Sequence, residues 1–117
     1  MQDLAVADRI ATLTLDRPPA NAINDAWVAA FHARLDELAA RDDWNLLHVR
    51  SRLRLFSAGA DLKDMRERYG TPEGRAAFQV GVRAMQVLFQ RIEDLARPTL
   101  AEIGGLAMGG GFELALA

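Results

Sequence analysis

The chain has 117 residues, a formal net charge of −2 and no cysteine. The length fits one small domain, and the charge argues against a nucleic-acid partner. Without cysteine the chain cannot form disulfides, use a thiolate nucleophile or hold a metal through sulfur. The first nine residues do not form a signal peptide, and no apolar run is long enough to span a bilayer. We therefore expect a cytoplasmic protein that binds neither nucleic acid nor membrane.

The first half of the chain predicts a strand, a helix and a second strand. Alternating apolar residues predict a strand over 10–15, which two prolines end. Apolar residues at helical spacing predict an amphipathic helix over 26–40, with Asn24 as its N-cap. A second short strand is predicted over 46–50.

The middle of the chain predicts a turn and two helices. Gly59 allows a tight turn over 57–61, and a short helix over 62–68 is expected to end at a glycine cap, Gly70. Thr71-Pro72-Glu73 then combines a capping hydroxyl, a first-turn proline and an acid, which together predict a helix start. Helical spacing continues to Arg97-Pro98, where we expect this long helix to end.

The last part of the chain predicts a third strand over 99–103, a glycine-rich segment over 104–111 and an apolar segment over 112–117. Strands that alternate with helices indicate an α/β fold. The sequence stops inside the apolar segment with no cap and no polar tail. We therefore expect residues 1–117 to be the N-terminal part of a single domain that is incomplete at its C-terminus.

The segment from Phe56 to Leu62 is the first candidate for chemistry. Small residues before a short helix leave backbone N–H groups open to a close ligand. Taken alone, the segment fits an ordinary strand-to-helix turn, in which Asp61 is the cap, better than a ligand site.

The segment from Ile103 to Leu114 is the second candidate. Three consecutive glycines follow a strand at the mouth of an apolar helix, where exposed N–H groups favour negative charge. No Gly-Lys-Ser/Thr follows, so the segment is not a Walker loop, and a dinucleotide site would rest on the glycines alone. A flexible turn is the alternative.

The remaining polar residues narrow the chemistry. His32 and His48 have no nucleophile beside them and are interpreted as structural, and no cluster of metal ligands is present, so we expect no metal. Backbone donors that stabilise an oxyanion, together with a nearby carboxylate that moves a proton, suit the formation of an enolate. Glu113 is the candidate carboxylate, and we expect its apolar surroundings to bury it. The alternative is a first-turn acid that only complements the helix dipole.

The two segments FSAGADL (56–62) and RPTLAEIGGLAMGGGFELALA (97–117) resemble the signature regions of the crotonase superfamily, the enoyl-CoA hydratase/isomerase family. The loop RPPANAIN (17–24) is similar to the first loop of that family. The resemblance covers essentially the whole chain. It implies the crotonase-like ββα spiral fold, with this chain as the N-terminal portion, truncated before the C-terminal helical region.

The resemblance also implies roles for individual residues. The peptide N–H groups of Ala60 and Gly110 would form an oxyanion hole, and Glu113 would be one of two catalytic acids, the second lying beyond Ala117. The coenzyme A moiety would contact the first signature, at Ala58, Gly59, Ala60, Asp61, Leu62 and Lys63. Its phosphates would need a local basic patch, for which the chain offers Arg50, Arg52, Arg54, Lys63, Arg66 and Arg68.

Two departures from the family pattern affect the loops. Pro19-Ala20 stands where many members carry a basic residue, which removes one phosphate contact. The segment 51–55 replaces a turn that usually contains glycine, so the shape of that loop is not given by the resemblance.

The implied function is the hydration of a trans-2-enoyl-CoA to a 3-hydroxyacyl-CoA in fatty acid metabolism, by a homotrimer or a dimer of trimers. Coenzyme A enters as part of the substrate, and no other cofactor is expected. Met65, Phe78 and Met85 are candidates for lining the acyl pocket. The alternatives within the family are a double-bond isomerase, a decarboxylase or a thioester hydrolase. From another class, the alternative is a non-catalytic CoA-binding fragment that lacks half of the active site.

Overall fold

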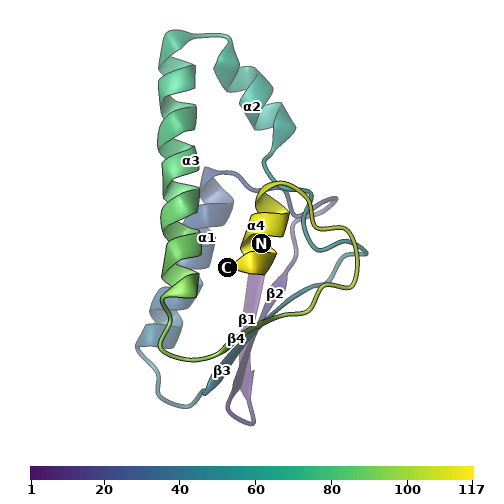
Figure 1. Ribbon diagram of the computed structural model, residues 1–117, viewed down its shortest axis with the longest axis vertical. Helices are drawn as coiled ribbons and strands as arrows, with labels where there is room; N and C mark the ends of the chain where they lie inside the picture. The colour runs from purple at the N-terminus through teal and green to yellow at the C-terminus, as the bar shows by residue number, and fades with distance from the viewer.

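A computed structural model of residues 1–117 shows four strands and four helices (Figure 1). The helices α1 and α3 lie side by side and contact each other, and the start of α4, at Gly110, lies close to Met85 of α3. The elements in chain order are β1 (Gln2–Ala7), β2 (Ile10–Leu15), α1 (Asp25–Ala39), β3 (Leu46–Ser51), α2 (Leu62–Tyr69), α3 (Pro72–Glu93), β4 (Thr99–Ala101) and α4 (Gly110–Leu116).

The strands form one mixed sheet in the order β1-β2-β3-β4. The pair β1–β2 is an antiparallel hairpin whose turn residues Asp8 and Arg9 have φ values of 51° and 64°, as the hairpin turns with two positive φ angles require. The pairs β2–β3 and β3–β4 are parallel, with helices in the connections. Strand β1 is an addition to the elements expected from the sequence.

Several predicted boundaries are confirmed. Strand β2 spans the predicted residues, α1 begins and ends one residue earlier than predicted, and β3 ends one residue later. The side chain of Asn24 accepts a hydrogen bond from the Trp27 N–H at 2.9 Å, and the Thr71 hydroxyl accepts one from the Gly74 N–H at 2.9 Å. Both predicted N-caps are therefore present.

Other boundaries were predicted wrongly. Helix α3 ends at Glu93 rather than at Pro98, because the chain turns at Asp94 and Leu95 to reach the edge of the sheet. Strand β4 is shorter than predicted, and α4 begins two residues earlier, at Gly110. Gly70 does follow α2, but its angles are those of a right-handed helix (φ −71°, ψ −15°), so the usual left-handed glycine cap is absent.

The core lies between the sheet and the helices α1 and α3. Alternate residues of β2 and β3 point into it, and α1 contributes Trp27 and Phe31, whose ring centroids are 5.2 Å apart. Phe56 and Leu88 are also fully buried there. This core fixes the start of α1 and the length of α3, which both border the candidate site.

The helices α2 and α3 extend together beyond the sheet (Figure 1). Helix α2 has no buried residue, and its end contacts α3 through the rings of Tyr69 and Phe78, whose centroids are 5.4 Å apart. The two helices therefore form a hairpin at one end of the molecule. None of the helices is both long enough and apolar enough to cross a bilayer.

Candidate functional site

The two segments singled out from the sequence are joined by backbone hydrogen bonds. The N–H groups of Phe56 and Ser57 donate to the Leu106 carbonyl, at 2.8 and 3.2 Å, and the Met108 N–H donates to the Ser57 carbonyl at 3.0 Å. Ser57 also forms a parallel bridge with Ala107. Residues far apart in the chain thus form one continuous backbone unit.

Asn21 holds the first loop against this unit. It is fully buried, has a φ of 48°, and its side-chain amide donates to Ser51 Oγ and to the Phe56 carbonyl, each at 2.8 Å. Its Oδ1 accepts from the Arg17 N–H at 2.8 Å, and its carbonyl accepts from Ser57 Oγ at 2.9 Å. The sequence analysis missed this residue, whose one signal was its ability to adopt a positive φ.

Gly59 and Gly111 allow the two segments to approach more closely than side chains permit. Gly59 has a φ of 92°, and a Cβ there would lie 2.8 Å from the Met108 carbonyl oxygen and 3.0 Å from the Gly110 nitrogen. A Cβ at Gly111 would lie 2.3 Å from the Ser57 carbonyl oxygen. The peptide of Gly59 therefore packs directly against that of Gly110. Ala60, which follows Gly59, consequently lies close to Gly110.

Two backbone donors at this junction have no acceptor. The N–H groups of Ala60 and Gly110 form no hydrogen bond within the chain, whereas the next N–H, that of Asp61, donates to the Ile23 carbonyl at 3.0 Å. Buried backbone donors without a partner are uncommon in folded proteins, and Gly110 is buried. The two N–H groups that the resemblance picks out are thus available to an acceptor from outside the chain.

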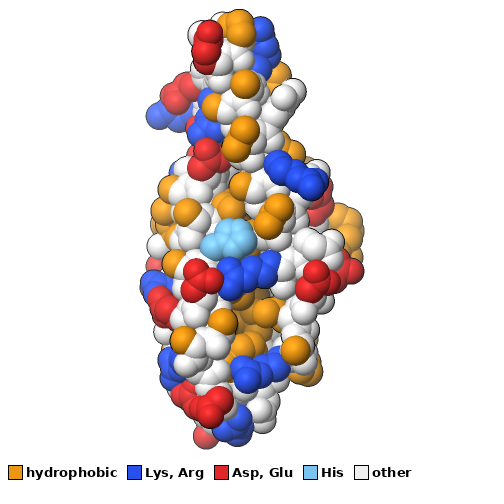
Figure 2. Space-filling view, turned by 90° about the vertical axis from the view of Figure 1, so that its left-hand side faces the viewer, with side chains coloured by type: hydrophobic (Ala, Val, Ile, Leu, Met, Phe, Trp, Pro, Cys, Tyr) orange, Lys and Arg blue, Asp and Glu red, His pale blue; other side chains and the backbone are white.

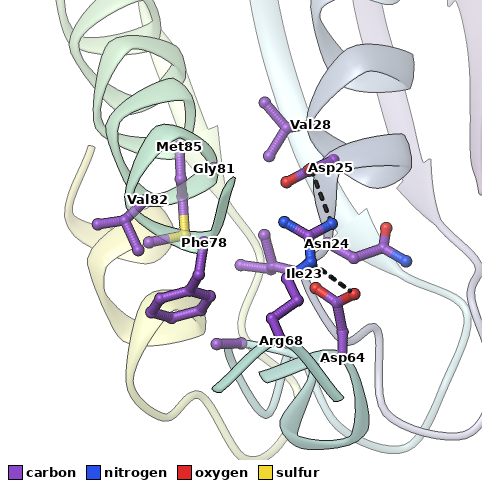
Figure 3. A pocket seen from close by; sticks show the side chains of 11 residues that line it. Ile23, Asn24, Asp25, Val28, Asp64, Arg68, Phe78, Gly81, Val82 and Met85 are labelled. Carbon is purple, nitrogen blue, oxygen red and sulfur yellow. Dashed lines mark hydrogen bonds and ion pairs between the residues drawn. The ribbon is translucent and has the colours of Figure 1, made fainter. Parts of the chain in front are cut away.

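An apolar cavity begins beside these donors (Figure 3). Phe78, Val82 and Met85 of α3 line it together with Ile23. The Gly110 peptide borders the cavity, because a Cβ at Gly110 would lie 3.3 Å from both Ile23 Cδ1 and Met85 Sδ. The cavity is lined by Ile23, Asn24, Asp25, Val28, Ala60, Asp64, Arg68, Phe78, Gly81, Val82 and Met85. Of the three residues expected to line an apolar pocket, Phe78 and Met85 do so, and Met65 does not.

A second, more open depression, which we call the outer hollow, lies on the other side of Ala60. Ala60 lines both the cavity and the hollow. The outer hollow is lined by Arg17, Pro18, Pro19, Ala20, Ala22, Ala58, Ala60, Asp61, Leu62 and Lys63. Five of the six residues expected to contact coenzyme A are therefore brought together, and Gly59 lies behind them against Gly110.

Asp61 stabilises the turn that carries Ala60. Its carboxylate accepts from the N–H groups of Lys63 and Asp64, at 3.1 and 3.2 Å, and pairs with Arg17 Nη2 at 3.0 Å. The Asp64 N–H lowers the pKa of the Asp61 carboxyl below its usual range, with Arg17 adding to the shift and desolvation opposing it. These contacts agree with the interpretation of Asp61 as the cap of α2.

The expected basic patch over 50–68 does not form as one surface. Arg50 pairs with Glu102 at 3.2 Å, and Arg52 and Arg68 each pair with two aspartates. Lys63 is the one member that lines the outer hollow. On the α3 side of the molecule, the cationic side chains are scattered and form no single patch (Figure 2). Arg50, Arg52 and Arg68 pair with carboxylates from different parts of the chain, which disperses the charges.

Glu113 is exposed, so its expected burial is wrong. Because α4 starts at Gly110, Glu113 falls on the face turned toward the last turns of α3. There it lines a shallow depression with Gln86, Gln90 and Glu93, and it lines neither the cavity nor the outer hollow.

Neither histidine lies in the site. His32 Nδ1 is 3.0 Å from Arg91 Nη1 between α1 and α3, and His48 Nε2 is 3.7 Å from Glu102 beside the sheet. Both positions agree with the structural role expected from the sequence.

Comparison with known proteins gives a consistent match. The family model described as enoyl-CoA hydratase/isomerase matches residues 6–117. A probable enoyl-CoA hydratase from Bacillus subtilis (strain 168) is 35% identical over 114 residues. Among solved structures, an enoyl-CoA hydratase/isomerase family protein from Silicibacter pomeroyi superposes with a TM-score of 0.87 at 30% identity. An enoyl-CoA hydratase from Bacillus anthracis superposes with a TM-score of 0.84 at 27% identity.

The chain spans less than half the length of each of these relatives. The match covers 97% of this chain and 43% of the Bacillus subtilis protein. It covers 98% of this chain and 48% and 44% of the two solved chains.

Proposed function

Because the chain belongs to the enoyl-CoA hydratase/isomerase family, we propose that the protein containing it adds water to a trans-2-enoyl-CoA thioester. The observation that carries the proposal is the pair of unpartnered N–H groups, Ala60 and Gly110, where the apolar cavity meets the outer hollow. The cavity receives the acyl chain, and the outer hollow receives coenzyme A.

In this mechanism the thioester oxygen accepts hydrogen bonds from both N–H groups. The oxygen of water attacks C3, the C2–C3 π electrons move toward the carbonyl, and the thioester oxygen gains negative charge. A proton then adds to C2, so that water has been added across the double bond. One preorganised donor of this kind typically contributes about 10²–10³-fold to turnover. Its contribution is greatest where water is excluded, as the apolar lining allows.

Glu113 is the proposed carboxylate that removes a proton from the attacking water. It requires a partner acid that lies outside residues 1–117, and it must face the thioester once the rest of the site is present. The exposure of Glu113 fits a side chain whose final surroundings include more than these residues.

The coenzyme A moiety is proposed to contact Ala58, Gly59, Ala60, Asp61, Leu62 and Lys63. Small residues there let the ligand approach the backbone. Lys63 lines the outer hollow and has no ion-pair partner, so its ammonium group is available to a phosphate. We propose that the complete protein is a homotrimer or a dimer of trimers in the cytoplasm and needs no cofactor besides its substrate.

The test is Glu113→Gln in the intact polypeptide that contains these residues. Loss of general-base catalysis should lower kcat for crotonyl-CoA by about 10²–10⁴-fold, with thioester affinity kept. Glu93→Gln is the matched control, because Glu93 lines the same depression and has no proposed role. Undiminished hydration by Glu113→Gln would remove Glu113 from the mechanism.

Two other functions each have one observation in their favour. A double-bond isomerase needs the same pair of N–H groups and a single base, and these residues contain a single candidate base. Product analysis with a 3-enoyl and a 2-enoyl thioester separates the two reactions. A non-catalytic CoA-binding module is favoured by the position of Glu113 outside the cavity. It predicts that calorimetry detects CoA binding while no thioester is turned over.

A further inference from the structure

One wall of the apolar cavity is an ion network that joins three helices. Arg68, near the end of α2, pairs through Nη2 with Asp25 Oδ2 at 2.9 Å and through Nε with Asp64 Oδ1 at 3.1 Å. Asp25 is the first residue of α1, and Arg68 Nη1 lies 3.4 Å from the Ala77 carbonyl on α3. Figure 3 shows Arg68 between the two carboxylates, directly across the cavity from Phe78.

Gly81 lets this network rest against the backbone of α3. A Cβ at Gly81 would lie 2.6 Å from Asp25 Oδ1 and 3.7 Å from Arg68 Nη1. The charged groups therefore occupy the space that a side chain on α3 would take. The ion network therefore packs directly against the backbone of α3 at Gly81.

The end of the hairpin formed by α2 and α3 closes the cavity further. Phe78 lines the cavity and packs on Tyr69, and Arg75 Nη1 donates to the Tyr69 carbonyl at 3.0 Å. The two helices are thus tied together just beyond Arg68.

The cavity is lined both by apolar side chains, among them Ile23, Val82 and Met85, and by the charged wall. On the proposed path, an acyl chain that enters beside Ala60 packs on the apolar side chains before it reaches the charged wall. Burial of the first methylenes of the acyl chain against these apolar side chains lowers the free energy of binding. Later methylenes would have to strip water from Arg68 and its carboxylates, which is unfavourable. We propose that the protein selects short acyl chains and that Arg68 is the residue that sets the limit. This inference rests on the proposed function, since it assumes that the cavity holds the acyl chain.

The test begins with the wild-type protein, as the intact polypeptide that contains these residues. kcat/KM is measured for crotonyl-, 2-hexenoyl-, 2-octenoyl- and 2-decenoyl-CoA. An apolar pocket that accommodates every acyl chain of the series should raise kcat/KM by about fourfold for each added methylene. We expect the rise to stop early in the series and kcat/KM to fall for decenoyl-CoA.

The variant Arg68→Met removes the guanidinium from the charged wall and keeps an apolar stem of similar length, and it releases the carboxylates of Asp25 and Asp64, whose side chains are 56% and 29% exposed, toward solvent. We expect the ratio of kcat/KM for decenoyl-CoA to that for crotonyl-CoA to increase at least tenfold. A general structural defect would lower kcat/KM for both substrates by the same factor. Arg83→Met on α3 is the matched control, because Arg83 is exposed and has no ion-pair partner, and it should leave the ratio unchanged.

Each outcome decides the question. A continuous rise through decenoyl-CoA in the wild type overturns the inference, as does an unchanged ratio in a folded Arg68→Met variant. If that variant does not fold, the wild-type series decides alone. If no substrate is turned over, calorimetry with saturated acyl-CoA thioesters of the same lengths repeats the series. Absence of binding to every thioester would overturn both the proposed function and this inference, whereas turnover without a chain-length limit would overturn the inference alone.

Discussion

Asp61 stabilises the turn before α2 both as a cap and as a charge. Because the pKa of its carboxyl is lowered in the folded state, the carboxylate contributes stability above its unfolded pKa of about 3.9. That contribution is lost as the pH falls through the lower, folded value. Asp61→Ala, which removes cap and charge, should cost about 1 kcal/mol at neutral pH. Denaturant unfolding measures this loss.

Asp61→Asn separates the two effects, since asparagine is an equally good cap and carries no charge. We expect it to be less stable than the wild type at neutral pH and equally stable once the wild-type carboxyl is protonated. A deficit that does not change between neutral and acidic pH would show that the charge of Asp61 and its pair with Arg17 contribute nothing.

At the scale of elements, the contact between the two backbone segments depends on Gly111 at the start of α4. A Cβ there would lie 2.3 Å from the Ser57 carbonyl oxygen, so Gly111→Ala must push α4 away from the first segment. We expect a loss of about 1–3 kcal/mol in the free energy of unfolding. Weaker binding of acyl-CoA should accompany it, since Gly110 moves with α4. Denaturant unfolding and calorimetry measure the two effects.

Gly104→Ala is the control for that variant. Gly104 lies in the same glycine-rich segment, and a Cβ there would meet no atom within 4 Å. The free energy of unfolding of Gly104→Ala should stay close to that of the wild type. Equal losses in both variants would mean that the backbone freedom of the segment matters, and not the close approach at Ser57.

Local patterns predicted most of the elements. Strand β2 was predicted correctly because its alternation is regular and prolines end it. The end of α3 was wrong because Leu95 continues the apolar spacing after the backbone has already turned. The start of α4 was late because Gly110 and Gly111 are helical but carry no side chains that could show a period. Strand β1 was missed because its inward face combines the polar Gln2 with only two apolar residues, Leu4 and Val6, so its apolar alternation is weak.

The candidate site could be predicted only in part. The two segments were recognised from their residues, but their contact depends on hydrogen bonds from Phe56 and Ser57 to Leu106, which no local pattern contains. The hydrogen bonds of the buried Asn21 and the ion network at Arg68 were missed for the same reason, since each joins elements that are distant in sequence. The burial of Glu113 was wrong because an apolar neighbourhood in sequence does not decide which face of a short helix a residue occupies.

At the scale of the whole molecule, the match to solved structures confirms the expected α/β, crotonase-like fold. The final part of the chain exposes large apolar side chains on one continuous stretch of sequence. These are Leu100, Ile103, Leu106, Met108, Phe112 and Leu116, each about half exposed or more. Exposed apolar side chains that gather in one patch mark a place where other protein packs.

We therefore expect a polypeptide restricted to residues 1–117 to bind an apolar dye and to self-associate. Phe112→Ser and Leu116→Ser together should reduce both properties, because both side chains are exposed on α4. Val80→Ser is the control, since Val80 is 71% exposed but lies on α3, outside this stretch. Dye fluorescence and light scattering provide the measurements. A dye-free monomer would show that this surface does not drive association.

The dependence of Phe56 and Ser57 on Leu106 has a consequence for how the protein is made. At the usual rate of about 5–20 residues per second, the ribosome adds Leu106 roughly 2–10 s after Ser57. During that time the N–H groups of Phe56 and Ser57 have no partner from the second segment, and Gly110 does not yet exist. Under the proposed function, a nascent chain that lacks Leu106 should therefore be unable to retain coenzyme A, even though every residue of the first segment has been synthesised.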